Sequence, residues 1–262
     1  MRWPYFPLLA SSLLPLAFLP LPLAPGANAQ TAARAKPLLF DLSLVPVTRD
    51  SFVFYLHGQE RGWAVWQYEI RRQEVTQEVV YTVKSEFRPI EEERLRVVLN
   101  RLTGEPISTF HHIDMFSPLS DTVMVEHDLE VKRGEISGRR RVGTKSGEVK
   151  IVPVNRPFAR GTVLADYVFI AGAVTNAAPG DSLDVPAYKE FADSLVTLSF
   201  VAERPVTIDV PAGRFDALPL RSGDFRIYAT RTGVRRVVKG ETLDGGFSFA
   251  LVRSGPVVPS SE

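Results

Sequence analysis

Histidine and aspartate side chains gather in two neighbouring stretches of the sequence, and such groups can ligate a metal ion. One stretch holds His111, His112 and Asp114, and the other holds His127 and Asp128. Imidazole nitrogens and carboxylate oxygens are common zinc ligands. However, adjacent residues of a strand point to opposite faces, so only one of the neighbouring histidines can lie beside His127. The HxH and HExxH spacings typical of metal sites are missing. We therefore predict a structural or pocket histidine at His127 and no metal site.

Nucleophilic catalysis and nucleotide chemistry lack their usual motifs. A serine hydrolase presents its nucleophile in a G-x-S-x-G turn, and neither Ser108 nor Ser137 has that context. No glycine-rich phosphate loop follows a strand and opens a helix, so no cofactor is predicted. Four glutamates alternate with apolar residues in strand-like runs and are expected on a solvated face: Glu60, Glu69, Glu78 and Glu126. We predict no catalytic residue and favour a protein that is not an enzyme.

Charge points to no particular partner. The chain has 31 Lys plus Arg and 30 Asp plus Glu, a near balance that disfavours binding to nucleic acid or to an anionic membrane surface. Two short runs of like charge, 91–93 (Glu) and 139–141 (Arg), lie beside turn signals. We expect both runs to be solvated ends of hairpins.

The first 29 residues have the composition of a secretory signal peptide that is cleaved after Ala29. Arg2 is the only charge, Leu8 to Leu23 is apolar, and Ala27 and Ala29 are the small residues that a signal peptidase reads. Prolines interrupt an apolar run that is already short for a bilayer, which disfavours a membrane anchor. No later stretch has spanning length, and the chain has no Cys, hence no disulfide or acylated cysteine. We expect a periplasmic or secreted protein without a transmembrane segment in the mature chain.

Most of the remaining sequence predicts β-strands. Residues 30–49 mix Ala, Pro and apolar residues without a period and are predicted to be a linker or arm, followed by a β-rich domain over 50–255 and a disordered tail over 256–262. The runs that predict strands are rich in β-branched and aromatic residues and are bounded by turn residues. They are 52–57, 63–70, 75–87, 95–102, 107–113, 122–131, 136–142, 149–154, 195–201, 206–210, 215–220, 225–229, 234–238 and 247–252.

Two segments between the strands break the pattern. Apolar residues over Gly161–Val174 recur near helical spacing and predict a helix. Residues 175–192 contain Pro179-Gly180-Asp181 and Pro186, and we expect an irregular loop with a short helical turn.

The stretch Val206 to Arg221 is predicted to be a hairpin around which the chain is organised. Val206, Ile208 and Val210 alternate with polar residues, and Pro211-Ala212-Gly213 forms the turn. Gly213 can adopt the positive φ that such turns need. A long twisted sheet curls, so we predict an all-β fold: a single antiparallel sheet curled into a barrel or half-barrel, with one or two short helices covering one side.

The C-terminal half resembles a known family. Several short motifs follow one another in a characteristic order. They are Tyr167 in the predicted helix, Gly180-Asp181, VPAGRFDALPL (210–220), Arg235-Arg236-Val237-Val238 and FSFAL (247–251). This order resembles that of an exported bacterial family of β-rich envelope proteins, described as a domain of unknown function. The resemblance covers roughly 50–255. It implies export and a shape distantly similar to the open-barrel lipoprotein carriers, and it supplies no catalytic residues.

The aromatic residues of the domain are more numerous than its candidate polar sites, and they suggest the function. Part of this set is ordinary core, and part could line a site for an apolar small molecule or lipid. The residues predicted to contact it are Trp63, Trp66, Tyr68, His127 and Tyr167. We therefore expect an exported, non-enzymatic protein that binds an apolar or lipid-like ligand in the cell envelope. The alternative is an envelope module that pairs a strand edge or patch with a partner protein. A metal-assisted hydrolase is the third and least favoured reading.

Overall fold

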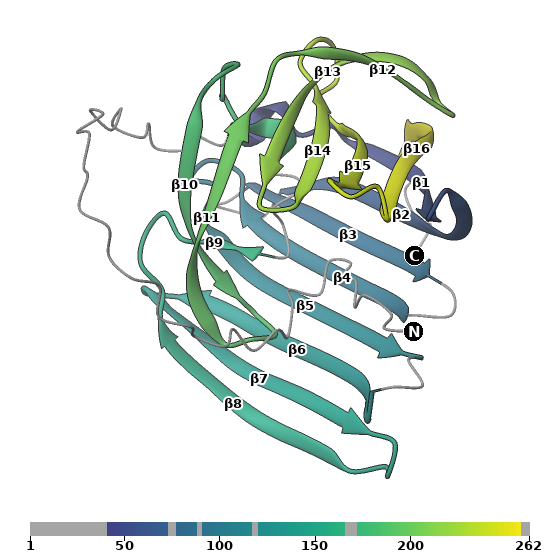
Figure 1. Cartoon of the computed structure of the whole chain (residues 1–262). Helices are drawn as coiled ribbons and strands as arrows, with labels where there is room; N and C mark the ends of the chain where they lie inside the picture. The colour runs from purple at the N-terminus through teal and green to yellow at the C-terminus, as the bar shows by residue number, and fades with distance from the viewer. Residues whose placement is uncertain (1–40, 73–76, 88–90, 117–119, 166–171, 258–262) are drawn as a thin grey trace, which may run out of the picture.

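The computed structural model describes residues 41–72, 77–87, 91–116, 120–165 and 172–257. In this part of the chain the fold is all-β, with one large and mostly antiparallel 16-stranded sheet (Figure 1). The prediction of an all-β chain with a single antiparallel sheet is therefore confirmed. Helical structure among the described residues is confined to short pieces, such as the 3-10 helix η1 (Leu42–Leu44) and residues 172–174.

The chain builds the sheet in two meanders. The first comprises β1 (Thr48–Leu56), β2 (Gln59–Arg72), β3 (Gln77–Phe87), β4 (Glu91–Asn100), β5 (Pro106–Met115), β6 (Thr122–Lys132), β7 (Glu135–Thr144) and β8 (Val149–Pro157). The second comprises β9 (Val163–Leu164), β10 (Ser182–Lys189), β11 (Ser194–Ala202), β12 (Val206–Val210), β13 (Gly213–Ser222), β14 (Phe225–Thr230), β15 (Val237–Thr242) and β16 (Phe247–Pro256).

The first and last strands join the two meanders in the middle of the sheet. β1 pairs with β16 in antiparallel register, with Phe54 opposite Phe249 and Leu56 opposite Phe247. The path runs from β8 back to β1, across to β16, and on through β13 and β11 to β9. No ladder joins β8 to β9 in the described chain, so the sheet is not closed. β8 and β9, from the middle of the chain, therefore form its ends.

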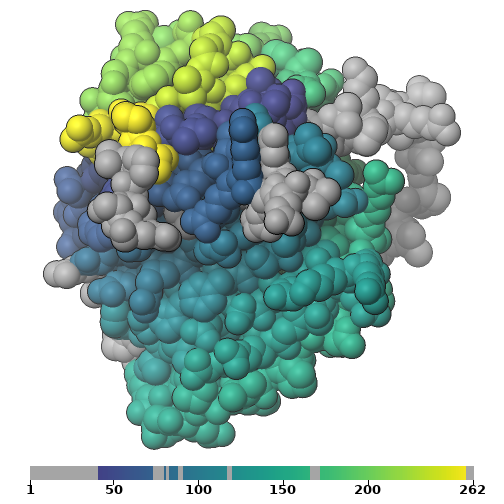
Figure 2. All heavy atoms as spheres, turned by 180° about the vertical axis from the view of Figure 1, so that it is seen from behind, coloured from purple at the N-terminus to yellow at the C-terminus, as the bar shows by residue number. Residues whose placement is uncertain are grey.

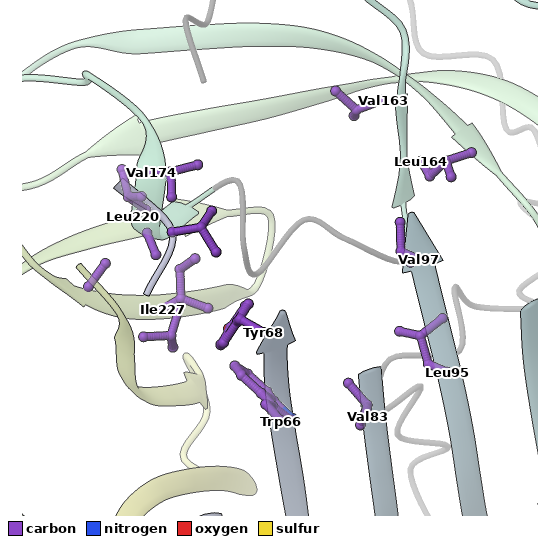
Figure 3. Close-up of a cluster of buried hydrophobic side chains, with 14 of the residues drawn as sticks. Trp66, Tyr68, Val83, Leu95, Val97, Val163, Leu164, Val174, Leu220 and Ile227 are labelled. Carbon is purple, nitrogen blue, oxygen red and sulfur yellow. The ribbon is translucent and has the colours of Figure 1, made fainter. Parts of the chain in front are cut away.

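The core lies between the inward faces of the two meanders. Trp66 and Tyr68 of β2 lie beside Ile227 of β14, and Val97 of β4 lies below Leu164 of β9 (Figure 3). Phe52 packs at 4.3 Å from Trp66 between ring centroids, and further edge-to-face ring pairs surround it. Each large apolar side chain buried in this way contributes about 1.5 to 3 kcal/mol.

The sheet bends strongly, so that strands far apart in the sheet order approach one another. β10 and β11 cross the strands of the first meander at a steep angle (Figure 1). Phe158, just after β8, lies 6.5 Å from Tyr188 of β10 between ring centroids. From behind, the strands of the first meander form a continuous surface below the green and yellow C-terminal strands (Figure 2).

The structure corrects the segments that were not predicted as strands. Residues 41–49 belong to the predicted linker, yet η1 and the start of β1 lie there, and Leu42 and Val45 are buried in the core. The loop predicted over 175–192 contains β10, with Pro186 inside it. Proline is tolerated because β9 pairs only with Ala187 and Tyr188 of β10, which leaves most of that strand edge without a ladder.

The predicted helix over Gly161–Val174 is also only partly present. Val163 and Leu164 form β9, parallel to β10, and residues 172–174 are helical, while 166–171 lie outside the described residues. The strand predicted over 234–238 begins later, at Val237. Of the predicted tail, Pro256 ends β16 and 258–262 lie outside the described residues. No helix among the described residues is long and apolar enough to span a membrane.

Candidate functional site

The aromatic residues predicted to contact a ligand do not converge. Trp66 and Tyr68 are buried on the inner face of β2, where Trp66 packs against Phe52 and Phe249. Trp63 has the opposite parity on the same strand and is 44% exposed. Tyr167 lies outside the described residues. His127 is buried, but on β6, four strands away from Trp66 along the sheet order.

Around His127 the structure brings together a set of polar residues on the inner face of β3 to β6. We call it the inner polar cluster; its members are Ser85, Glu91, Glu93, Thr109, His111 and His127. Each is at most 5% exposed. Buried polar groups are costly unless they are hydrogen-bonded, so this concentration is unusual for the inside of a β-sheet.

Hydrogen bonds connect the cluster across neighbouring strands. His111 Nε2 lies 2.7 Å from Glu93 Oε1, and the hydroxyl of Ser85 donates to Glu93 Oε2 at 2.8 Å. His127 Nε2 shares a hydrogen bond with Thr109 Oγ1 at 3.3 Å. The two imidazole rings stand edge to face with centroids 5.5 Å apart. The carboxylate of Glu93 is thus held from two strands at once.

Strand register explains why these side chains meet. His111 of β5 is directly opposite His127 of β6 and opposite Leu95 of β4. Glu91 and Glu93 continue the inward alternation of Leu95 along β4, while Glu92 points outward and is exposed. Because side chains alternate with period two, the residues at odd positions of β4 must share the face that carries the core.

The acidity of Glu91 is strongly perturbed. Burial, together with the negative charge of Glu93, raises the pKa of Glu91 to about 8, against an opposing effect of His111. The carboxyl group is therefore largely protonated at neutral pH and can donate a hydrogen bond.

The turn between β10 and β11 covers the cluster. The ring of Phe191 lies 4.7 Å from each of the two imidazole rings, His111 and His127, between centroids. Arg140 of β7 donates to the Phe191 carbonyl oxygen. Asp193, in the same turn, accepts from the Tyr188 hydroxyl at 2.7 Å and pairs with Arg156 at 2.9 Å. We call residues 190–193 with these contacts the cover turn.

His112 belongs to a separate surface group. It lies on the outer face of β5, with Nδ1 3.0 Å from Glu126 and Nε2 3.1 Å from Asp114, and Arg141 pairs with Glu126 at 3.0 Å. As expected, only one of the adjacent histidines joins His127. Among the described residues no group of three or more His, Asp or Glu side chains has an arrangement that could hold a metal ion.

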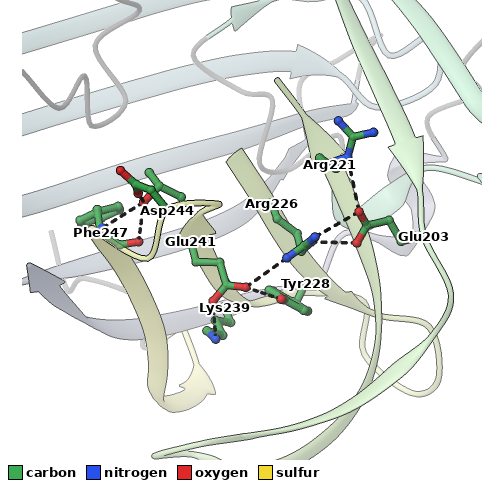
Figure 4. A network of polar contacts seen from close by, with 9 residues as sticks. Glu203, Arg221, Arg226, Tyr228, Lys239, Glu241, Asp244 and Phe247 are labelled. Atoms are coloured by element: carbon green, nitrogen blue, oxygen red, sulfur yellow. Dashed lines mark hydrogen bonds and ion pairs between the residues drawn. The ribbon is translucent and has the colours of Figure 1, made fainter. Parts of the chain in front are cut away.

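A second polar network joins Glu203, just after β11, to residues of β13, β14 and β15, and it is internally paired (Figure 4). Arg226 donates to both carboxylate oxygens of Glu203, at 2.8 and 3.2 Å, and the Tyr228 hydroxyl donates to Glu241. Lys239 pairs with Glu241 at 2.6 Å. Since its charges compensate each other between strands, this network explains pairing of the strands rather than ligand chemistry.

The sequence interpretation missed the two inner glutamates. The run 91–93 was expected to be a solvated hairpin end, and this is wrong for Glu91 and Glu93. The signal was present, because Leu95, Val97 and Leu99 continue the same alternation toward the other end of β4. The run 139–141 lies in the middle of β7 and not at a hairpin end: Arg139 is exposed as expected, Arg141 is half-buried, and Arg140 faces the cover turn.

Comparisons with known proteins give one weak structural likeness. No protein-family model matches the chain, and no curated protein matches its sequence. A solved structure described as a β-barrel-like protein of the domain of unknown function DUF1849 from Brucella abortus is similar, with a TM-score of 0.44 and 10% identity. The match covers 82% of this chain and 99% of that one. Export remains a prediction.

Proposed function

We propose that the chain binds an apolar or lipid-like ligand in the cell envelope, without chemical conversion, on the inner face of a half-barrel formed by the curled sheet. The cover turn would be displaced, the apolar part of the ligand would take the place of Phe191, and its polar end would meet the inner polar cluster.

The observation that carries this proposal is the position of Phe191. This half-buried ring rests on two imidazoles, while the rest of the inner surface offers apolar partners. An aromatic side chain is stabilised more by apolar contacts than by polar groups that need hydrogen bonds. The contacts of Asp193 and the Phe191 carbonyl hold the turn in place through polar groups at its rim. Polar contacts of this kind contribute about 0.5 to 1.5 kcal/mol each, so a ligand could displace the turn.

The test uses the neutral apolar dye N-phenyl-1-naphthylamine. Saturable binding that gains fluorescence is expected for the full chain, and Phe191→Ala should tighten it about tenfold, since ~1.4 kcal/mol of competition by the ring is removed. Phe116→Ala is the matched control, because Phe116 is an exposed ring at the end of β5. Unchanged affinity in Phe191→Ala, or no saturable binding to either protein, would overturn the proposal.

An interaction module is the second candidate, and the edge strand β8 favours it. One edge of β8 has no partner strand in the described chain, and Val149 and Ile151 are exposed there. Exposed edges can accept a strand from another protein. Native mass spectrometry of protein purified from its own envelope fraction separates the two candidates: a co-purifying lipid supports the first, and a stoichiometric protein supports the second.

A further inference from the structure

Arg231 occupies an unusual position in the loop that follows β14. The inward side chains of that strand include Ile227 and Ala229, and Arg231 has the same parity one step beyond the strand. Its Nη1 donates to the carbonyl oxygen of Thr175 at 2.7 Å, directly after the helical residues 172–174. This hydrogen bond engages one of the three nitrogens of the guanidinium group.

The other side of the same guanidinium lacks acceptors. Nε and Nη2 are both buried, and no described residue accepts a hydrogen bond from either. Leaving buried donors of a charged group without hydrogen bonds destabilises the folded state. Burial, and to a smaller extent the neighbouring charge of Arg235, lowers the pKa of Arg231 to about 10. The cation is therefore held in a place that destabilises it.

The acidic groups near this loop are engaged elsewhere. Asp41 accepts from both the backbone N–H and the hydroxyl of Ser43. Asp50 accepts from the hydroxyl of Ser254 and pairs with Arg236 at 3.5 Å. The charge that acts on Arg231 is that of Arg235. Arg226 differs, because each of its three guanidinium nitrogens contacts Glu203 or Glu241.

The geometry of these two buried, unpartnered nitrogens indicates what they would bind. Nε and Nη2 lie on one edge of the guanidinium, the edge that donates two parallel hydrogen bonds to a carboxylate or a phosphate group. Lysine cannot form this fork. We propose that Arg231, assisted by the charge of Arg235, forms a binding site for an anionic carboxylate or phosphate group. The site stands apart from the inner polar cluster and does not depend on the ligand proposed there.

The first experiment follows the Arg Nε–H signals by NMR in the full chain. Inorganic phosphate and acetate represent free anions, dodecanoate represents an anionic head group on an apolar chain, and dodecanol is its neutral counterpart. A shift of the Arg231 signal with phosphate or acetate identifies a site for free anions. A shift with dodecanoate but not with dodecanol, phosphate or acetate identifies a head-group site. If none of the anions moves this signal, the proposal is wrong.

Variants test the fork itself. Arg231→Lys keeps the charge and loses the paired donors, so anion affinity should fall at least about tenfold. Arg214→Gln, at an exposed arginine of β13, is the control and should bind the anion with the affinity of the parent.

The melting temperature supplies a second readout. The anion should raise the melting temperature of the parent and of Arg214→Gln, and it should not raise that of Arg231→Lys. An equal rise in all three would show that Arg231 is only structural. The dye affinity should change in Phe191→Ala and stay the same in Arg231→Lys. The proposed apolar-ligand site and the proposed anion site can therefore fail independently.

Discussion

At the scale of residues, the notable feature is a pair of carboxyl groups inside the sheet. Glu93 is stabilised by His111 and Ser85, whereas Glu91 is kept protonated by burial and by the charge of Glu93. Two buried carboxylates of like charge repel each other, and neutralising one of them relieves the repulsion. The raised pKa of Glu91 therefore makes the stability of the molecule depend on pH.

The stability of the fold should fall as the pH rises through the range in which Glu91 ionises. Its pKa lies near 4.5 when it is solvated and near 8 in the folded chain, so the folded state binds the proton more tightly. The stabilisation is complete below about pH 4.5 and is lost progressively up to about pH 8, at a cost on the order of a few kcal/mol. Glu91→Gln should flatten this dependence, and Glu92→Gln should not. Urea unfolding at about pH 5 and about pH 8 measures it; a parallel decrease in Glu91→Gln would contradict the assignment.

At the scale of elements, the hairpin of β12 and β13 forms as predicted but occupies another place. Val210 pairs with Gly213 and Ile208 with Phe215, so Pro211 and Ala212 make the turn. However, β12 lies off the main path of the sheet, and Val206 is 40% exposed. Ile208 and Val210 pack only partly against the core. The chain is organised around the pairing of β1 with β16, and the hairpin attaches to it where Ala212 N–H donates to the Leu251 carbonyl oxygen at 3.0 Å.

The conformation of Gly213 still makes its replacement costly. Its φ is +130°, a value that residues with a Cβ rarely adopt. Gly213→Val should therefore lower the free energy of unfolding by more than about 1 kcal/mol. Ala212→Ser keeps the backbone donor and should change it little. Urea unfolding of both variants is the measurement, and equal midpoints would mean that the turn does not constrain this hairpin.

At the scale of the whole molecule, the fold depends on contacts between the two ends of the described chain. Asp50 of β1 accepts a hydrogen bond from Ser254 of β16, 204 residues away in sequence. Such non-local pairings must form against the entropy of closing a long loop, which slows folding. Both meanders must therefore be present before the core between them can close.

Export is the prediction that belongs to this scale. The chain recovered from the cell envelope should begin at Gln30, because the small side chains of Ala27 and Ala29 suit the signal peptidase. Ala29→Leu should block cleavage and leave the larger precursor, whereas Gln30→Asn should be processed normally. N-terminal sequencing measures this, and a parent protein that retains Met1 in the envelope fraction would refute it.

Local sequence determined the strands, because strand formation depends on alternation and on turn residues a few positions apart. This is why the run at 122–131 and the turn at 211–213 could be predicted, and why His127 was correctly assigned to the apolar face. Tertiary structure decided what no local pattern contains. Four features depend on segments brought together from distant parts of the chain. They are the burial of Glu91, the strand around Pro186, the position of Phe191 over two histidines and the unpartnered nitrogens of Arg231.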